Sequence, residues 1–261
     1  MAIVIRASGT SLEVPSSPTS DFTTGLSARY LFTSDASDSL GNYDTMTAES
    51  AVTYDSSNGV YFEKIGNTSR ISLGADSTST SASKLLNDIG TNDGTISFWL
   101  NPDTNQIDDS GNDASFILGS YAGSTIGTRG PQFGYFDDQP TVNGDKGGWH
   151  FFSRVGTGSS FEGVLWEGDS GTTWVHIVFT YDSATDTAKL YKDGSLADTQ
   201  TFANGFPQDR REWIMNGSAQ SPTASTLQWE GYFKDLSIWD GRILTADEIS
   251  DLYDNGHGGS Y

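Results

Sequence analysis

The sequence predicts a single all-β domain, and three observations support this prediction. Short segments rich in aromatic and β-branched residues recur along the chain, separated by stretches of Gly, Ser, Thr, Asn and Asp. This pattern is typical of many short strands joined by tight turns. Aromatic residues make up 12% of the 261 residues, which allows a substantial core although only 35% of the chain is hydrophobic. A chain of this length also suits one undivided β domain.

The expected strands follow one another from Gly25 onward. The segment 95–100 is the clearest of the early ones, because its alternation places Ile96, Phe98 and Leu100 on one face. The other segments with strand character are 28–32, 60–62, 70–73, 116–118, 132–136 and 149–155.

A hairpin is predicted between residues 174 and 203. Residues 174–181 are apolar on both faces, which indicates a central strand. A turn at 182–186 leads to a second strand at 188–192. Asp193-Gly194 then supplies the positive φ angles that a tight hairpin turn needs.

Two helical segments are expected, one short turn at 83–89 and one helix near the C-terminus. Thr245 and Glu248 form a capping box at the start of the second. Ile249, Leu252 and Tyr253 share one face of this helix, and Asn255-Gly256 ends it.

Residues 1–24 differ in character from the rest of the chain. Ile3 and Ile5 alternate with Val4 and Arg6, and residues 16–20 have the composition of a linker. Two interpretations are open: an N-terminal arm that docks on a partner, or an edge strand followed by a loop. The folded domain is assigned to residues 25–261.

The charge balance narrows the choice of partners. Thirty-four acidic and 14 basic residues give a net charge of -20, which repels nucleic acid and anionic lipid headgroups. We therefore expect neither nucleic acid nor membrane as a partner. The absence of Cys excludes disulfides and thiolate metal sites. The apolar stretch at the N-terminus is too short for a secretory signal, so none is expected.

Four segments, in order, carry a family resemblance. They are Leu31-Phe32 with Asp38-Ser39-Leu40-Gly41-Asn42, then Gly94 to Leu100, then Trp174 to Gly194, and last Gly231 to Ile249. Across roughly residues 25–256 the chain resembles the laminin G-like, pentraxin-related branch of the concanavalin A-like lectin/glucanase superfamily. The resemblance implies a two-sheet, antiparallel, jelly-roll-like sandwich with one short C-terminal helix. It also implies binding or adhesion, because most relatives have such roles.

The resemblance further implies a structural calcium ion. Its ligands would be Asp38, the Gly41 carbonyl, Asn42 and Asp235, since calcium prefers six to eight oxygen ligands. The last strand departs from the family pattern, because Lys234 stands where bacterial relatives often place the acid. An alternative stays open, in which Asp38 organises a turn through its own side chain.

A second candidate site lies between two expected strands. Carboxylates and amides there accompany aromatic rings, the combination that sugar binding requires. An ordinary loop of turn residues is the alternative. The residues of this candidate site are Tyr135, Asp137, Asp138, Asn143, Asp145 and Trp149.

No catalytic residue is predicted. Hydrolases of this superfamily carry a Glu-x-Asp-x-x-Glu strand that places acid and nucleophile in the cleft. The chain has no such run, and Glu162, Glu167 and Asp169 have the wrong spacing. His176 falls in the central strand and is interpreted as a core residue.

An adhesion fold without an export signal suggests display on a virus particle. The leading hypothesis is a phage virion-surface protein, such as a head decoration, head fibre or tail fibre, that contacts host surface glycans. The N-terminal arm would bind virion structural proteins. A homo-oligomer is also expected, and a trimer is the assembly that we predict. Three alternatives remain open: an extracellular location, a virion cement protein without a glycan ligand, and a glycan hydrolase.

Overall fold

The computed structural model describes most of the chain beyond its first 20 residues. The described ranges are 21–49, 51–63, 69–75, 78–103, 114–120, 131–136, 148–154, 161–168, 171–203, 205–206, 212–216 and 228–256. The description below concerns these residues.

The described residues form fifteen strands and two short helices. The strands are β1 (Ala28–Tyr30), β2 (Thr47–Ala48), β3 (Thr53–Asp55), β4 (Gly59–Phe62), β5 (Ile71–Ser72), β6 (Gly94–Pro102), β7 (Ala114–Ser120), β8 (Gln132–Phe136), β9 (Gly148–Arg154), β10 (Phe161–Glu167), β11 (Val175–Asp182), β12 (Thr187–Lys192), β13 (Ser195–Thr201), β14 (Trp213–Met215) and β15 (Gly231–Asp240). The helices are α1 (Ala82–Asp88) and α2 (Ala246–Asp254).

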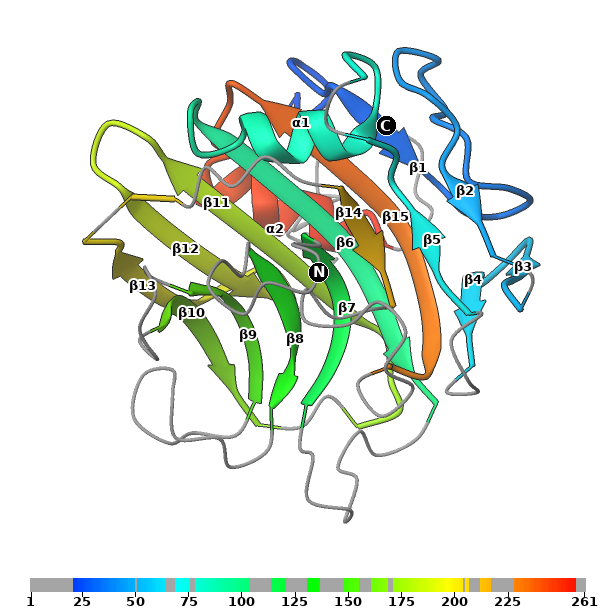
Figure 1. Cartoon of the computed structure of the whole chain (residues 1–261). Coiled ribbons are helices and arrows are strands. Elements are labelled where there is room, and N and C mark those ends of the chain that lie inside the picture. Colours follow the sequence, from blue (N-terminus) through cyan, green and yellow to red (C-terminus); the bar gives the residue numbers. More distant parts are fainter. Residues whose placement is uncertain are drawn as a thin grey trace, which may run out of the picture.

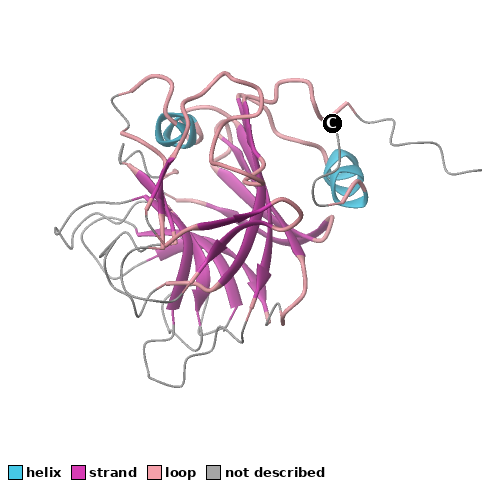
Figure 2. Ribbon diagram, turned by 90° about the vertical axis from the view of Figure 1, so that its right-hand side faces the viewer, coloured by secondary structure: helices cyan, strands magenta, loops and turns pink. Residues whose placement is uncertain are grey.

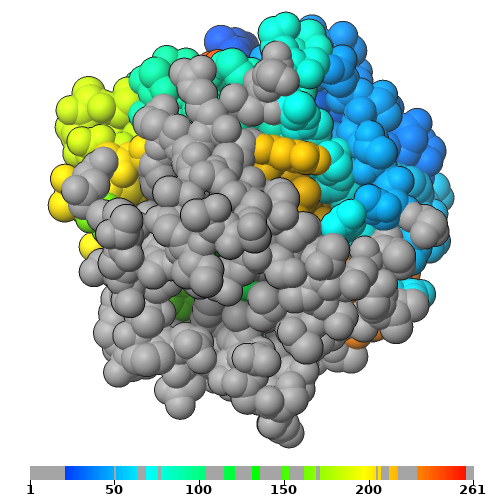
Figure 3. Space-filling model, in the orientation of Figure 1, coloured from blue at the N-terminus to red at the C-terminus, as the bar shows by residue number. Residues whose placement is uncertain are grey.

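The strands form two antiparallel sheets, which pack as a jelly-roll-like sandwich (Figure 1). Sheet A has the order β13-β12-β11-β6-β15-β4-β3, with β1 also paired to β15, and sheet B has the order β10-β9-β8-β7-β14-β5-β2. In the space-filling view, the blue and cyan N-terminal part lies along one side of the molecule and the yellow-green β11–β12 turn lies on the other (Figure 3). The predicted fold class is confirmed.

Aromatic side chains join the two sheets. Phe98 of β6 meets Phe133 of β8 at a ring-centroid distance of 5.0 Å. Phe151 of β9 stacks on Phe179 of β11 at 3.8 Å. Offset-stacked and edge-to-face contacts of this kind add to the free energy gained by burying the rings. These contacts fix which residues of each strand face inward.

The predicted hairpin is confirmed in detail. β11 lies between β6 and β12, and all but the last of its residues are buried, as a central strand requires. Asp193 and Gly194, at the turn that follows β12, have φ angles of 48° and 75°. Both angles are positive, as a type I′ hairpin turn demands.

Both helices form where the sequence predicts them, and they lie on opposite sides of the strands (Figure 2). The capping box of α2 is present, with the Thr245 hydroxyl accepting from the Glu248 N–H and the Glu248 carboxylate accepting from the Thr245 N–H. Within the described part of the chain, neither helix is long and apolar enough to cross a membrane.

Helix α2 covers part of the outer face of sheet A. Its Ile249 and Leu252 pack with Trp239 of β15 and with Phe22, which is only 6% exposed. The Trp239 indole N–H donates to the Phe22 carbonyl at 2.8 Å. Phe22 falls within the segment assigned to the arm, so the sandwich gains a contact from the end of that segment.

Strand β15 changes neighbours along its length. Residues 231–233 pair with β4, and residues 236–238 pair with β1. Between these two stretches the register with β6 shifts, and Asp235 adopts a φ of 57°. Such a bulge places an extra residue in one strand and re-aims its side chain. The Asp235 side chain therefore departs from the simple alternation that the sequence suggests.

His176 lies beneath α2 and is fully buried, as predicted. Its ring stacks on Trp99 at 4.7 Å, and its Nε2 lies 2.8 Å from the Ser97 hydroxyl oxygen. Burial lowers the pKa of His176 from 6.5 to about 4, although Asp235 and Asp193 act in the opposite direction. The imidazole is therefore neutral in the folded protein at pH 7.

The depressed pKa of His176 predicts a loss of stability in mild acid. As pH falls from about 6.5 to about 4, the unfolded chain takes up a proton that folded His176 excludes. The free energy of unfolding should then fall by up to about 1.4 kcal/mol per pH unit, or roughly 3 kcal/mol in total, through this residue. Chemical denaturation at a series of pH values would measure the change.

His176→Gln provides the comparison for this pH dependence. The variant cannot titrate, so its unfolding free energy should change less than that of the wild type between pH 6.5 and 4. Equal pH slopes for the two proteins would show that His176 does not carry the effect.

Candidate functional site

A row of polar and aromatic side chains crosses the outer face of sheet A. In the register of the sheet, Tyr232 of β15 pairs with Asn101 of β6 on one side and with Tyr61 of β4 on the other. Paired residues of antiparallel strands point to the same face. Their neighbours Leu100 and Phe233 are fully buried, so this row faces away from the core.

The two tyrosines and two carboxylates of this row are linked. The Tyr61 and Tyr232 rings lie 4.8 Å apart with an interplanar angle of 55°. The Tyr61 hydroxyl lies 2.8 Å from Asp103 Oδ2 and 3.3 Å from Glu230 Oε1. A phenol has one proton to donate, so the Tyr61 hydroxyl donates to one of these two carboxylates at a time.

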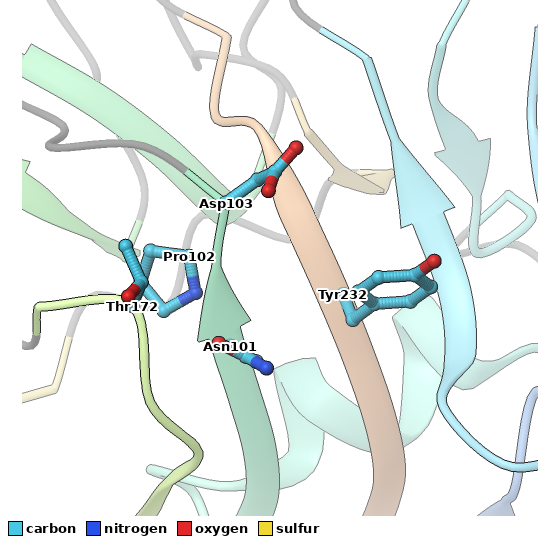
Figure 4. Close-up of a pocket in the computed structure, with 5 residues that line it drawn as sticks. All are labelled: Asn101, Pro102, Asp103, Thr172 and Tyr232. Atoms are coloured by element: carbon cyan, nitrogen blue, oxygen red, sulfur yellow. The ribbon is translucent and has the colours of Figure 1, made fainter.

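A cavity of about 270 Å³ opens beside this row (Figure 4). In the close-up, Tyr232 projects from β15, and Asp103 lies near the end of β6, with Pro102 and Thr172 on the far side. The volume is below the range of about 300–1,000 Å³ that is usual for pockets of drug-sized ligands. The lining residues are Asn101, Pro102, Asp103, Thr172 and Tyr232.

Gly231 explains how β15 and β6 come so close at this point. Its φ is 144°, and a Cβ placed on it would lie 2.4 Å from the Asn101 carbonyl oxygen. A larger residue would push the strands apart. Backbone hydrogen bonding continues beyond the strand end, because the Asp103 N–H donates to the Glu230 carbonyl at 3.3 Å. The cavity wall is therefore built on paired backbone.

Burial, followed by the hydrogen bond to Asp103, raises the pKa of the Tyr61 hydroxyl above its usual value. Tyr61 therefore stays protonated at physiological pH and serves as a donor. Among the described residues that line the cavity, none is Lys or Arg. The site thus combines an aromatic surface with hydrogen-bonding oxygen and amide groups and a negative charge.

The residues that the structure describes at the cavity do not show the carboxylate arrangement of a glycosidase. Such enzymes place two carboxyl groups on opposite sides of the scissile bond. Asp103 is the one carboxylate among the described lining residues, and Glu230 shares the Tyr61 hydroxyl with it.

The Ser97–His176 pair resembles a nucleophile with its base, but it lies in the interior. Ser97 is 2% exposed and His176 is not exposed at all. The Nδ1 atom of His176, where a triad needs an orienting acid, has no hydrogen-bond partner among the residues that the structure describes. Within this part of the chain, the pair therefore has neither substrate access nor the third group.

The predicted calcium ligands are placed as follows. The Asp38 Oδ1 accepts from the N–H groups of Arg29 (2.8 Å) and Leu40 (3.1 Å), and its Oδ2 accepts from those of Asn42 (2.8 Å) and Tyr43 (3.0 Å). Each carboxylate oxygen has about two lone-pair positions, so these four donors occupy the group. This geometry agrees with the alternative in which Asp38 organises a turn.

The other predicted ligands do not complete a cation site in this arrangement. Asp235 is bound to the Arg29 guanidinium, and the Asn42 side chain donates to the Ser27 carbonyl. Asp38, Asn42 and Asp235 therefore do not fit a calcium ion as they are placed, and the calcium site, including the Gly41 carbonyl, stays a prediction. In the described ranges, no group of three or more His, Cys, Asp or Glu side chains is arranged to hold a metal.

The predicted sugar-binding loop is described only at its two ends. Tyr135 and Trp149 lie opposite each other on β8 and β9 and are 4% and 0% exposed. Both belong to the core, where Trp149 stacks on Phe133, so neither ring is available to a sugar. This corrects the role predicted for the two rings. Asp137, Asp138, Asn143 and Asp145 lie outside the described residues.

The sequence carries a weak signal for the tyrosines beside the cavity. Tyr61 stands between the buried residues Val60 and Phe62, and Tyr232 stands between the buried residues Gly231 and Phe233. Because side chains alternate along a strand, this pattern predicts that both tyrosines face outward. Their pairing depends on strand register, which alternation does not reveal.

Comparison with known proteins identifies the family. The sequence profile described as the concanavalin A-like lectin/glucanases superfamily matches residues 73–250, more than half of the chain. The chain belongs to this superfamily. No curated protein matches the sequence.

Solved structures with the superfamily fold include carbohydrate-related and toxin domains. Domain 4 of AbnA, a GH43 extracellular arabinanase from Geobacillus stearothermophilus solved in complex with arabinotriose, is 19% identical, with a TM-score of 0.58 over 87% of this chain and 98% of that one. The botulinum neurotoxin serotype D binding domain is 12% identical, with a TM-score of 0.62 over 88% of this chain and 51% of that one. The Paraclostridial Mosquitocidal Protein 1 binding domain is 17% identical, with a TM-score of 0.59 over 88% and 52%.

These likenesses extend over most of this chain, which spans about half the length of the two toxin binding domains. At such identities they establish the shared sandwich and nothing finer. Two of the three similar structures are binding domains by their own description.

The environment of Asp38 predicts a specific cost for removing its charge. In Asp38→Asn an NH₂ group would face backbone N–H donors, so the free energy of unfolding should fall by about 1–3 kcal/mol. Thermal or chemical unfolding in the presence of a chelator would measure it. Asp35→Asn is the matched control in the same loop, because exposed Asp35 accepts locally from Ser37 and should cost less than about 0.5 kcal/mol. Equal losses in the two variants would contradict the special role of Asp38.

Proposed function

We propose that this chain is a non-catalytic, lectin-like module that binds carbohydrate. The observation that carries the proposal is the cavity beside Tyr232, where an aromatic ring adjoins the Asp103 carboxylate, the Asn101 amide and the Thr172 hydroxyl. A ring can stack on the apolar face of a sugar while planar acceptors bind its hydroxyls. The arabinotriose in the AbnA domain 4 structure supports the same ligand class on this fold.

The charge of the site favours neutral glycans. Asp103 lines the cavity, Glu230 lies next to it through Tyr61, and none of the described lining residues is basic. The whole chain carries a net charge of -20. A sugar with a carboxylate or sulfate would meet repulsion from both sources. Neutral hexose or pentose oligosaccharides are therefore the expected ligands.

We further propose that the module is displayed on a phage virion, as a head decoration, head fibre or tail fibre that contacts host surface glycans. The strong negative charge supports this, because it keeps closely spaced copies from associating. The lack of Cys suits assembly in a reducing compartment. The segment 1–24 would attach the module to virion proteins, and a trimer is the expected assembly. Mass spectrometry of purified particles tests this, and absence of the chain from virions would reject it.

A glycan array, probed with and without calcium, tests the binding function. Binding to neutral oligosaccharides supports a lectin-like module. Silence under both conditions favours a structural cement role instead. Release of reducing sugar from storage glucans would establish a hydrolase and reject the non-catalytic assignment.

Tyr232→Ala should weaken glycan binding about tenfold or more, which corresponds to about 1.4 kcal/mol. The substitution removes the ring that forms one wall of the cavity and leaves the backbone pairing of β15 in place. Titration calorimetry with a ligand found on the array would measure the change, and thermal unfolding would confirm that the variant is folded.

Asp103→Asn tests the polar part of the same site, with Asp247→Asn as its control. Asp247 is exposed in the first turn of α2, near the opposite end of β15 from the cavity. We expect Asp103→Asn to lower affinity for the neutral ligand and Asp247→Asn to leave it unchanged. If all three variants bind like the wild type, the ligand lies elsewhere on the molecule.

A further inference from the structure

Arg29 links the first described strand to the bulge of the last one. The residue lies on β1 opposite Ser237 of β15. Its Nε donates to Asp235 Oδ1 at 2.7 Å, and its Nη2 donates to Asp235 Oδ2 at 2.8 Å. The side chains of Arg29 and Asp235 are 7% and 2% exposed. The contact is therefore a bidentate ion pair in the interior, the geometry in which Arg binds a carboxylate most strongly.

The backbone of Arg29 holds the loop that follows β1. Its N–H donates to Asp38 Oδ1 at 2.8 Å, and its carbonyl accepts from the Ser39 N–H at 2.7 Å and from the Ser39 hydroxyl at 2.9 Å. One residue thus connects the loop of Asp38 and Asn42 with the bulge of Asp235. These are the two segments from which the family resemblance would draw calcium ligands.

The bulge in β15 directs Asp235 to this position. At the register shift β15 has an extra residue relative to β6, and Asp235 adopts a left-handed backbone conformation. The Ser237 hydroxyl, which lies on the same side, also donates to Asp235 Oδ1 at 3.3 Å. In this chain the acidic residue stands at Asp235, one position later than in the family pattern, where Lys234 stands instead. This later position is the one from which the carboxylate reaches the Arg29 guanidinium.

A buried carboxylate needs a cationic or hydrogen-bonding partner, because leaving water without one is strongly unfavourable. Calcium would meet this need with six to eight oxygen ligands. Here Asp38 is occupied by four N–H donors and Asp235 by a guanidinium, so the need is already met. We propose that Arg29 is the built-in cation that replaces calcium at this position, so that the fold does not require the metal there.

The first test compares Arg29→Met with Arg70→Met. Arg70 also pairs with a carboxylate, that of Glu49 at 3.1 Å, but their side chains are 24% and 42% exposed. Arg29→Met should lower the Tm by at least about 8 °C, because breaking a buried ion pair is far more costly than breaking an exposed one. The Arg70 variant should lose less than about 2 °C. Equal losses would overturn the proposal.

A double variant keeps the test valid if Arg29→Met does not fold. Arg29→Met/Asp235→Asn removes both charges and should be more stable than Arg29→Met alone, since no buried charge is left without its partner. If the double variant is no more stable than the single one, the electrostatic role of Arg29 is rejected.

The second test measures calcium dependence directly. Unfolding of the wild type in EDTA and in millimolar calcium should give the same Tm. A rise with calcium that the double variant lacks would show a metal at Asp235 and overturn the proposal. A calcium-dependent rise in Tm that the double variant retains would come from other carboxylates of this acidic chain and would agree with the proposal.

Discussion

The aromatic contacts between the two sheets are the constraint on which the rest of the structure depends. Phe98 against Phe133, and Phe151 against Phe179, commit one face of β6, β8, β9 and β11 to the interior. Because side chains alternate along a strand, this commitment also decides which residues face outward. Tyr135 and Trp149 share the inward side with Phe133 and Phe151 and are lost to recognition. Tyr61 and Tyr232 alternate with core residues along their strands and therefore face outward.

Local signals in the sequence were sufficient to predict an all-β domain and several of its elements. The apolar run 174–181, the Asp193-Gly194 turn and the Thr245/Glu248 capping box each depend on residues close together in the chain, and each is found where it is expected. Local patterns of this kind need no knowledge of the partner strand. Alternating strands without long helices can bury one face in a sandwich or in a barrel, and it is the family resemblance that predicted the two-sheet sandwich.

The site could not be predicted in the same way, because it depends on pairing between distant segments. Tyr61 and Asp103 are 42 residues apart, and Tyr61 and Glu230 are 169 apart. Arg29 and Asp235 are separated by 206 residues. Such contacts are set by strand order and register, and a shift of one residue would turn every side chain to the other face. The bulge at Asp235 adds a shift of this kind that simple alternation does not show.

Strand β15 gives the cavity a rigid base. Its first residues pair with β6 on one side and with β4 on the other, so Tyr232 projects from an interior strand of sheet A rather than from a loop. A few residues later, the bulge and the Arg29–Asp235 pair hold the same strand to β1. Side chains fixed on paired strands lose little conformational freedom when a ligand binds. A small, open cavity of this kind makes few contacts, so the rigidity of its wall becomes important for affinity. The ion pair and the aromatic row are thus parts of one arrangement, in which the interior of the sandwich fixes the surface proposed to bind the ligand.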